Sequence, residues 1–495
     1  MSHAARLGLV LSLLLCSCTD FDALSRSYES DLSGGEVADL SATTDGPPLR
    51  DLALTGDMQP ICNDGLIGAG ETDIDCGGGC SPCDVSRACV SDVDCQTGFC
   101  DAGRCELVSG PPNWLPVGNL ATNNNPPIAR YDIAMATAPD GSVLVLGGRD
   151  GGGVLLNTVE RLDENFNWTT GSMFRSRARF AATTTSDAVY AIDGAKGGSF
   201  ENTVERSTNP PNNFSLTGGN IGQSISDHGA VSLADKVYVY GGNDGTDTLA
   251  TASVFTNNMN ASASIKSMNT PREHFGAARG VDGRIYAMGG INDSGSLATA
   301  EAYDLAADKW TNIAALPEAR ATAPAVAAPD GRIYMVGGAD AQNGKMFKNA
   351  VAYRPPAPGR AERWSTVASM ASPRWRHGAA LGADGRIYVV GGADLITLPR
   401  LVEAYGPIVT TNTGTVAPGG NVTVSGSNFA KNTSVKFMLD SATSGVIGTG
   451  NTDGNGALAA TTVTIPATAT MKTTRLFAID ARSRYPVSIR LTISN

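Results

Sequence analysis

The sequence is poor in the residues that most often carry metal or acid–base chemistry. It contains 4 histidines, and none of its 10 cysteines lies beyond Cys105. Zinc and copper sites are built mainly from these two residue types. The sequence also lacks the Gly-x-Ser-x-Gly motif of a hydrolase nucleophile and a glycine-rich phosphate loop. We therefore expect no cofactor and no metal, and these absences favour a binding protein over an enzyme.

A broad basic surface is missing as well. The net charge is −11, and residues 19–61 contain nine acidic residues but only two arginines. An acidic N-terminal segment followed by a nearly neutral remainder of the chain offers little attraction to a phosphate backbone, so we expect no nucleic-acid partner. Residues 19–61 are rich in Ser, Asp, Gly and Pro and have no sustained apolar period, which is typical of a solvated tether.

The N-terminus has the pattern of an export signal. Arg6 precedes the apolar run Leu7 to Leu15, which is too short to span a bilayer. The string Leu15-Cys16-Ser17-Cys18 that ends this run resembles the bacterial lipobox, which implies a signal peptide over residues 1–18 and acylation of Cys18. Thr19 follows in place of the Asp that retains such lipoproteins in the inner membrane. The resemblance thus implies an outer-membrane lipoprotein, at the cell surface or facing the periplasm; ordinary cleavage without lipid is the alternative.

Eight cysteines are concentrated in residues 62–105. They are Cys62, Cys76, Cys80, Cys83, Cys89, Cys95, Cys100 and Cys105. An even number in a short exported segment predicts a disulfide-rich module, whose pairing the sequence leaves open. Zinc at Cys80 and Cys83 is the alternative, but the segment has no histidine. The string ETDIDCGGGCSPC resembles a cysteine-rich module of bacterial surface lipoproteins.

The central part of the chain is repetitive. Six alternating apolar strands end at Gly148, Gly194, Gly242, Gly290, Gly338 and Gly392, which are spaced 46 to 54 residues apart. This is the length of one propeller blade. Each unit also has an Asp-Gly type turn and further alternating strands, and the 58 glycines and 25 prolines suit an all-β chain. Four strands in each unit predict a β-propeller.

The diglycine, the tyrosine before it and a late tryptophan (Trp168, Trp310, Trp364) together resemble the kelch repeat. Unit two departs from it with Asp193-Gly194, and unit three has no late tryptophan. The resemblance implies a six-bladed kelch-type propeller over residues 112–405. The sixth unit lacks a fourth strand, and the string around Trp114 has the missing pattern. We therefore expect an N-terminal strand to complete the last blade and to cover its edges.

The pattern changes after Tyr405. Residues 406–495 alternate Thr and Val between turn residues, which predicts a small β-sandwich. The string GGNVTVSGSNF resembles the immunoglobulin-like (IPT/TIG-like) modules of bacterial surface proteins. A propeller followed by a sandwich also resembles galactose oxidase. That family needs a cysteine crosslinked to a tyrosine beside its copper, and no cysteine is available here.

The units align on a recurring arginine. Five of them carry it four residues before a small residue, at Arg130, Arg177, Arg272, Arg320 and Arg374, whereas unit three has Ile225. Near the start of an innermost strand, these side chains are predicted to line one mouth of the channel and to bind carboxylate or phosphate. The alternative is that each arginine caps carbonyls or pairs with local acids such as Glu160 and Glu301.

Of the three histidines in the repeats, His228 and His377 share a register and His274 does not. We include His377 among the candidate ligand-binding residues and assign no metal to the others. Our leading hypothesis is a cell-envelope binding or adhesion module that recognises an acidic peptide or glycan at an arginine-lined mouth. The alternatives are an enzyme on an acidic sugar, similar to the kelch-type sialic-acid mutarotases, and a structural protein of envelope assembly. Fold alone does not decide among them.

Overall fold

The computed structural model describes the backbone of Cys100–Asp101 and Arg104–Cys105, and residues 113–117, 129–219, 221–256, 259, 262–356, 362–394, 398–399 and 401–494 in full. All the regular elements among them are strands, so the all-β class is confirmed. None of them forms a helix long and apolar enough to cross a membrane. The expected signal peptide, Cys18, the tether and the side chains of the cysteine-rich segment lie outside these residues.

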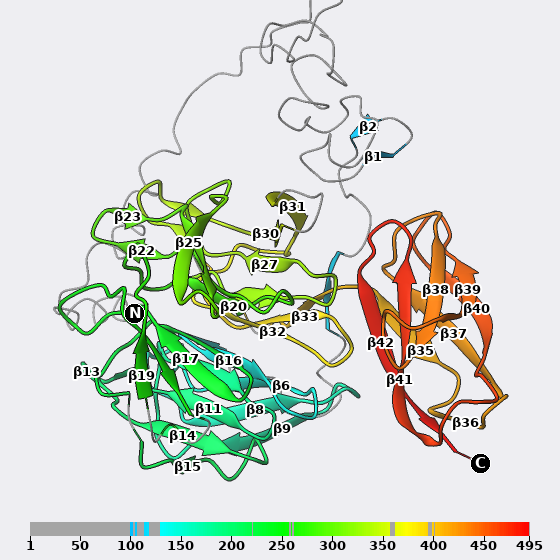
Figure 1. The fold of residues 1–495 in the computed structure, drawn as a ribbon, viewed down its shortest axis with the longest axis horizontal. Coiled ribbons are helices and arrows are strands. Elements are labelled where there is room, and N and C mark those ends of the chain that lie inside the picture. The colour runs from blue at the N-terminus through cyan, green and yellow to red at the C-terminus, as the bar shows by residue number, and fades with distance from the viewer. Residues whose placement is uncertain are drawn as a thin grey trace, which may run out of the picture.

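Six antiparallel sheets of four strands, numbered here as blades 1 to 6, occupy the repeats (Figure 1). From the innermost strand outward, their bounds are as follows: blade 1, β5 (Ala134–Thr137), β6 (Val143–Leu146), β8 (Thr158–Leu162) and β9 (Trp168–Ser172); blade 2, β10 (Ala181–Thr184), β11 (Val189–Ile192), β14 (Val204–Ser207) and β15 (Ser215–Leu216); blade 3, β16 (Gly229–Leu233), β17 (Lys236–Tyr240), β18 (Ala252–Phe255) and β19 (Ser262–Ile265); blade 4, β20 (Gly276–Arg279), β21 (Ile285–Met288), β24 (Ala300–Asp304) and β25 (Lys309–Ile313); blade 5, β26 (Ala325–Ala327), β27 (Ile333–Val336), β30 (Asn349–Arg354) and β31 (Arg363–Ser369); blade 6, β32 (Gly378–Leu381), β33 (Ile387–Val390), β34 (Glu403–Tyr405) and β3 (Trp114–Pro116).

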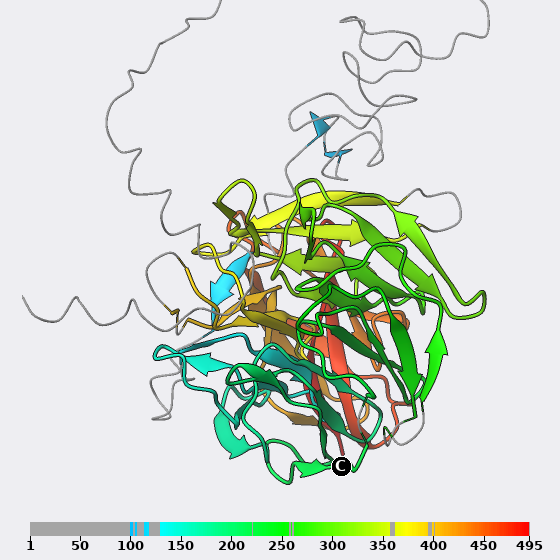
Figure 2. The same cartoon turned by 90° about the vertical axis from the view of Figure 1, so that its left-hand side faces the viewer.

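The blades follow one another around a common centre, from cyan through green to yellow in Figure 2. Each innermost strand lies beside the innermost strands of both neighbouring blades, and β32 of blade 6 lies beside β5 of blade 1. The N-terminal strand β3 pairs with β34, with Trp114 opposite Tyr405. The Trp114 indole donates to the Ala368 carbonyl at 2.9 Å. The first described strand of this region therefore completes the last blade.

The second strand of each blade forms most of the core. β6, β11, β21, β27 and β33 are buried at every position, because blades pack against both of their faces. Alternating β-branched and aromatic residues suit such strands. Each buried Val, Leu or Ile contributes about 1.5–3 kcal/mol relative to an exposed one.

Short two-stranded pairs lie next to the blades, within the loops after the second strands or, for the pair beside blade 1, between such a loop and the segment that precedes β5. They are β4 (Arg130–Tyr131) with β7 (Arg149–Asp150), β12 (Ala195–Lys196) with β13 (Ser199–Phe200), β22 (Ile291–Asn292) with β23 (Gly295–Ser296), and β28 (Ala339–Asp340) with β29 (Lys345–Met346). A further pair, β1 (Cys100–Asp101) with β2 (Arg104–Cys105), precedes the blades. We call the face of the disc with the loops between second and third strands the ring face. The opposite face, with the turns between first and second strands, is the turn face.

Two facing sheets follow the blades. One contains β35 (Ile408–Thr411), β37 (Asn421–Ser427) and β40 (Leu458–Thr464), and the other contains β36 (Thr415–Val416), β42 (Pro486–Ile493), β41 (Lys472–Asp480), β38 (Ser434–Leu439) and β39 (Val446–Asn451). Buried Val424, Phe437 and Leu476 lie among the residues of their common core. The C-terminal residues thus form a β-sandwich.

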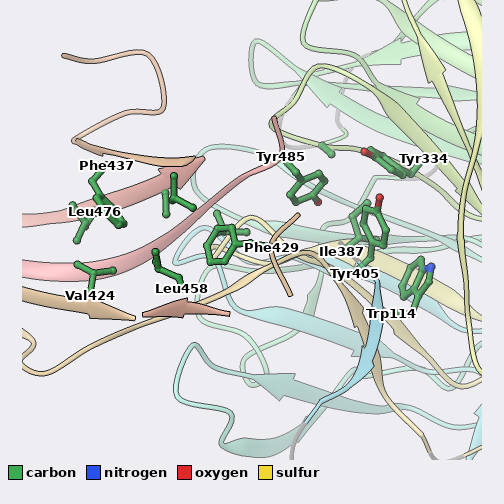
Figure 3. Packing of buried hydrophobic residues seen from close by; sticks show 14 of the residues in the cluster. Trp114, Tyr334, Ile387, Tyr405, Val424, Phe429, Phe437, Leu458, Leu476 and Tyr485 are labelled. Carbon is green, nitrogen blue, oxygen red and sulfur yellow. The ribbon is translucent and has the colours of Figure 1, made fainter. Parts of the chain in front are cut away.

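The sandwich packs on the turn face. Tyr485 lies between the blade and sandwich cores in Figure 3, with its ring centroid 5.5 Å from Tyr405 and 6.0 Å from Tyr334. Its hydroxyl donates to the Gly385 carbonyl at 2.8 Å. Arg475 also pairs with Glu164, in the turn between β8 and β9, at 3.0 Å. These contacts cover part of the turn face near blades 1, 5 and 6.

Candidate functional site

The five aligned arginines do not line the mouth of the channel. Arg130, Arg177, Arg272, Arg320 and Arg374 are each 0% exposed. Each lies just before the first strand of its blade, but its side chain is directed into the blade. The structure therefore corrects the prediction of an arginine-lined mouth, because none of these guanidiniums has a surface on which to bind a ligand.

Four of the arginines pair with a glutamate on the third strand of their own blade. The pairs are Arg130 with Glu160, Arg177 with Glu205, Arg272 with Glu301 and Arg374 with Glu403, at 3.0, 2.7, 2.8 and 2.5 Å. The guanidiniums also donate to backbone carbonyls, as Arg272 does to Gly289 and Thr299 at 2.6 and 2.9 Å. The alternative interpretation of the sequence, carbonyl capping and pairing with local acids, is the one that the structure confirms.

The backbone at these positions joins each blade to the next. The second residue of each diglycine, or of Asp193-Gly194, donates its N–H to the carbonyl of the following arginine position at 2.8–3.0 Å. The donor and acceptor pairs are Gly148 and Arg177, Gly194 and Ile225, Gly242 and Arg272, Gly290 and Arg320, Gly338 and Arg374, and Gly392 and Arg130. The last of them connects blade 6 to blade 1. These glycines have φ between 85° and 104°, which other residues adopt at a cost.

Arg320 differs from the other four arginines. Val351 occupies the third-strand position of the glutamate, opposite Met335. Nε and Nη2 of Arg320 have no hydrogen-bond partner among the described residues, while Nη1 donates to the Gly337 carbonyl at 3.3 Å. The guanidinium stacks over Phe347, 4.2 Å from its centroid. Burial lowers the pKa of Arg320 to about 10.

His377 is also buried, at 5% exposure. Burial, together with the charge of Arg374, lowers the pKa of His377 to about 3, so that the imidazole is neutral at pH 7. The ideal Cβ position of Gly392 lies 2.6 Å from the Cβ of His377, which indicates a closely packed contact between the two. His377 therefore acts as a packed residue of blade 6, and the prediction that it contacts a ligand is corrected.

A different set of six residues, two positions after the arginine register, lies where the blades meet. We call them the central ring: Asp132, Arg179, Asp227, His274, Thr322 and Arg376. All six have left-handed φ of 53° to 56°. From Asp132 through Thr322, the N–H of each donates to the carbonyl of the preceding member, at 2.7–3.1 Å, with Arg376 preceding Asp132. Because hydrogen bonds link residues of adjacent blades, the ring lies where the blades converge on the axis.

Opposite charges alternate around much of the ring. Arg376 Nε lies 3.6 Å from Asp132 Oδ1, and Arg179 pairs with Asp227. His274 Nδ1 is 2.9 Å from Asp227 Oδ1. Burial opposes ionisation of Asp227, but the charges of Arg179 and His274 bring its pKa well below the usual value. The two arginines are 24% and 27% exposed, whereas Asp132 and Asp227 are only 4% and 3% exposed, so the acids chiefly hold the arginines in place.

Exposed apolar side chains lie in loops of the same face. Phe174, in the linker between blades 1 and 2, is 64% exposed, and Val154, between β7 and β8, is 60% exposed. The Arg376 guanidinium stacks over the Trp375 ring at 4.3 Å. A site with paired charges at its centre and apolar side chains around it suits a polypeptide with both kinds of group better than a purely acidic ligand.

Most of the central ring is not apparent from the sequence, because its members share a position and a backbone conformation but no single residue type. Their position in the aligned units could have identified them, because each lies two residues after an aligned arginine or, in unit three, after Ile225. The non-glycine residues in left-handed conformation are a second indicator, since such strain is retained where the side chain matters.

Part of the chain matches a known protein family. Residues 179–392 match the family described as KLHDC2/KLHL20/DRC7 Kelch-repeats domain. The matched range begins at a member of the central ring and ends at the second glycine of the last diglycine, so it includes blades 2 to 5 completely. No curated protein matches the chain significantly.

Proposed function

Because residues 179–392 are kelch repeats, which generally mediate protein–protein interaction, we propose that this chain is a binding protein whose ring face takes a polypeptide segment of a partner. The bound segment lies across the central ring and contacts Arg179 and Arg376 with its acidic groups. Its apolar side chains pack on Phe174 and Trp375. The platform is a six-bladed disc, and the immunoglobulin-like sandwich serves as a support on the turn face.

The position of the protein in the cell is part of the same proposal. Acylation of Cys18 anchors the chain to the outer membrane, the acidic residues 19–61 act as the tether, and disulfides stabilise residues 62–105. The partner is then a protein or glycoprotein outside the cytoplasm. The support for this part comes from the N-terminal pattern of the sequence.

The observation that carries the proposal is the contrast between two neighbouring positions. The arginine position recurs as the same residue in five blades and is buried in all of them. Two residues later, the ring position holds four residue types, Asp, Arg, His and Thr, in nearly the same backbone conformation. A position that is uniform in geometry and varied in chemistry is suited to recognition, because acidic, basic and neutral groups from different blades then meet on one surface.

A display experiment tests the proposal. We would pan a phage-displayed random peptide library on the immobilised full chain and measure the affinity of enriched peptides by biolayer interferometry. The test variant is Arg179→Ala/Arg376→Ala, whose side chains are 24% and 27% exposed and paired with ring acids. Loss of two charged contacts should weaken binding at least about tenfold, at roughly 1.5–3 kcal/mol for each hydrogen bond to a charged group.

The matched control is Arg206→Ala/Arg284→Ala. These arginines are 26% and 27% exposed and are also paired with aspartates, Asp187 and Asp282, but lie near the turn face. We expect the control to bind peptides as the unchanged chain does. Equal weakening by both variants, or enrichment of peptides that ignore the ring variant, would contradict the proposed site. Enrichment of no peptide at all would favour a glycan ligand or the enzymatic alternative over a protein partner.

A further inference from the structure

Three groups with metal-binding atoms meet at one side of the central ring. Asp227 precedes blade 3, whereas Glu273 and His274 lie together in the linker that precedes blade 4. Carboxylate oxygens of the two acids and a ring nitrogen of the histidine all lie within 4.8 Å of one another. The sequence did not predict this group, because residues 227 and 273 are far apart in the chain and His274 does not share the register of the other two histidines.

The backbone holds two of the three groups in place. Asp227 and His274 are neighbours in the central ring, and the His274 N–H donates to the Asp227 carbonyl at 3.1 Å. Their side chains meet at Oδ1 and Nδ1, 2.9 Å apart. Two ligand atoms that each lie about 2.1 Å from one ion are about 3.0–3.4 Å apart at angles of 90–110°. A small outward movement of the imidazole therefore converts this contact into a pair of adjacent ligands.

Glu273 supplies the third group and is not satisfied by the protein alone. Its Oε2 is shielded from solvent and has no hydrogen-bond partner among the described residues. Burial raises the pKa of Glu273, and the neighbouring charge of Asp227 adds to the effect. The side chain of Asn243 hydrogen-bonds to the same carboxyl group and helps to orient it. A cation at this point would supply the missing partner and stabilise the ionised carboxylate.

We propose that Asp227, Glu273 and His274 form a binding site for a divalent transition-metal ion such as Zn²⁺ at the ring face. The imidazole binds through Nδ1 and carries its proton on Nε2. Arg179 pairs with Asp227 and fixes its orientation, as the outer groups of metal sites commonly do. One nitrogen and two oxygen ligands leave at least one coordination position, which water or a carboxylate of a bound polypeptide fills.

Zinc titration of the full chain tests the site. The chain, freed of metal with a chelator, is titrated with Zn²⁺ by isothermal calorimetry, and with Co²⁺ to obtain a visible spectrum. The test variants are Glu273→Gln and His274→Gln. Each should weaken the affinity of this site by about tenfold or more, since removal even of outer partners has an effect of that size. Thermal unfolding without metal shows whether each variant is folded.

Glu318→Gln is the matched control. Glu318 is an exposed acid, also in a linker between blades, and pairs with Lys345 away from the three ligands. It should bind Zn²⁺ as the unchanged chain does. The cobalt spectrum should lack the thiolate charge-transfer band that binding to the cysteines of residues 62–105 produces. Equal zinc affinity and stoichiometry in all four proteins, a spectrum of thiolate ligation alone, or no zinc binding by the unchanged chain would each overturn the proposal.

Discussion

The buried pair of Arg272 and Glu301 offers the most direct test of how a blade is stabilised. Both side chains are 0% exposed and lie 2.8 Å apart. Glu301 also accepts hydrogen bonds from the N–H groups of Asn269 and Thr270, at 2.7 and 3.0 Å. It therefore connects the third strand to the linker that precedes the blade. The substitution Glu301→Leu removes all three interactions at once.

The expected loss follows from the charge that remains. Leaving one member of a buried ion pair without its partner costs about 3–5 kcal/mol. Arg272→Met/Glu301→Leu removes both charges and should recover part of the loss, with a remainder of about 1–3 kcal/mol from the two unsatisfied N–H groups. Arg320 is the natural comparison, because it has no glutamate partner. Arg320→Met should change stability by about 1 kcal/mol or less, since a carbonyl bond and ring stacking are lost while a desolvated charge is removed.

Urea denaturation followed by tryptophan fluorescence measures these differences, with Trp310 as a buried reporter in the blade of Arg272. The order of stability should be the unchanged chain and Arg320→Met first, then the double variant, then Glu301→Leu. If Glu301→Leu destabilises the chain no more than Arg320→Met, the glutamate does not connect strand and linker in the way described here.

Three further predictions follow from the fold. Trp114→Ala should lower stability by about 3–5 kcal/mol, because the buried indole packs on Tyr405, and an unchanged thermal midpoint would show that β3 does not close the ring. Burial raises the pKa of Asp193 from 3.8 to about 8, so its contribution to stability is lost as the pH rises through this interval. Asp193→Gly should flatten the pH dependence of urea unfolding between these values and suits the φ of 49°. Burial lowers the pKa of His377 from 6.5 to about 3, so stability falls as the pH drops below 6.5, and a smaller loss in His377→Leu by acid titration would confirm it.

The repeated features of the fold were accessible from the sequence. Strand alternation and the diglycines mark the second strands, since these are buried on both faces and end at a turn with positive φ. The position of Trp114 also indicated where the fourth strand of the last unit lies. The sequence pattern after Tyr405 predicted strands but not their order, because pairing such as that of β36 with β42 depends on contacts between distant residues.

The direction of the arginine side chains was less accessible. Alignment placed Arg272 and its equivalents at the start of the innermost strands, and exposure was inferred from that position. The decisive partner, Glu301, lies 29 residues later, after the first two strands of the blade and the short β22–β23 pair. Unit three indicates the pairing, because Ile225 replaces the arginine there and Ser253 occupies the position of the glutamate. The joint loss of both residues is what a buried pair predicts.

The way in which β3 joins the disc determines how the molecule responds to force. Asn428 of the sandwich binds the backbone of Asn113 from both sides, accepting from its N–H at 3.1 Å and donating to its carbonyl at 3.0 Å. Directly after these two hydrogen bonds, Trp114 begins the strand that completes blade 6. If the chain is held by its N-terminus, a pulling force reaches the Asn113–Asn428 hydrogen bonds and the β3–β34 pair before any other part of the disc. Under load, the strand that closes the ring is therefore also the first part of the disc that we expect to detach.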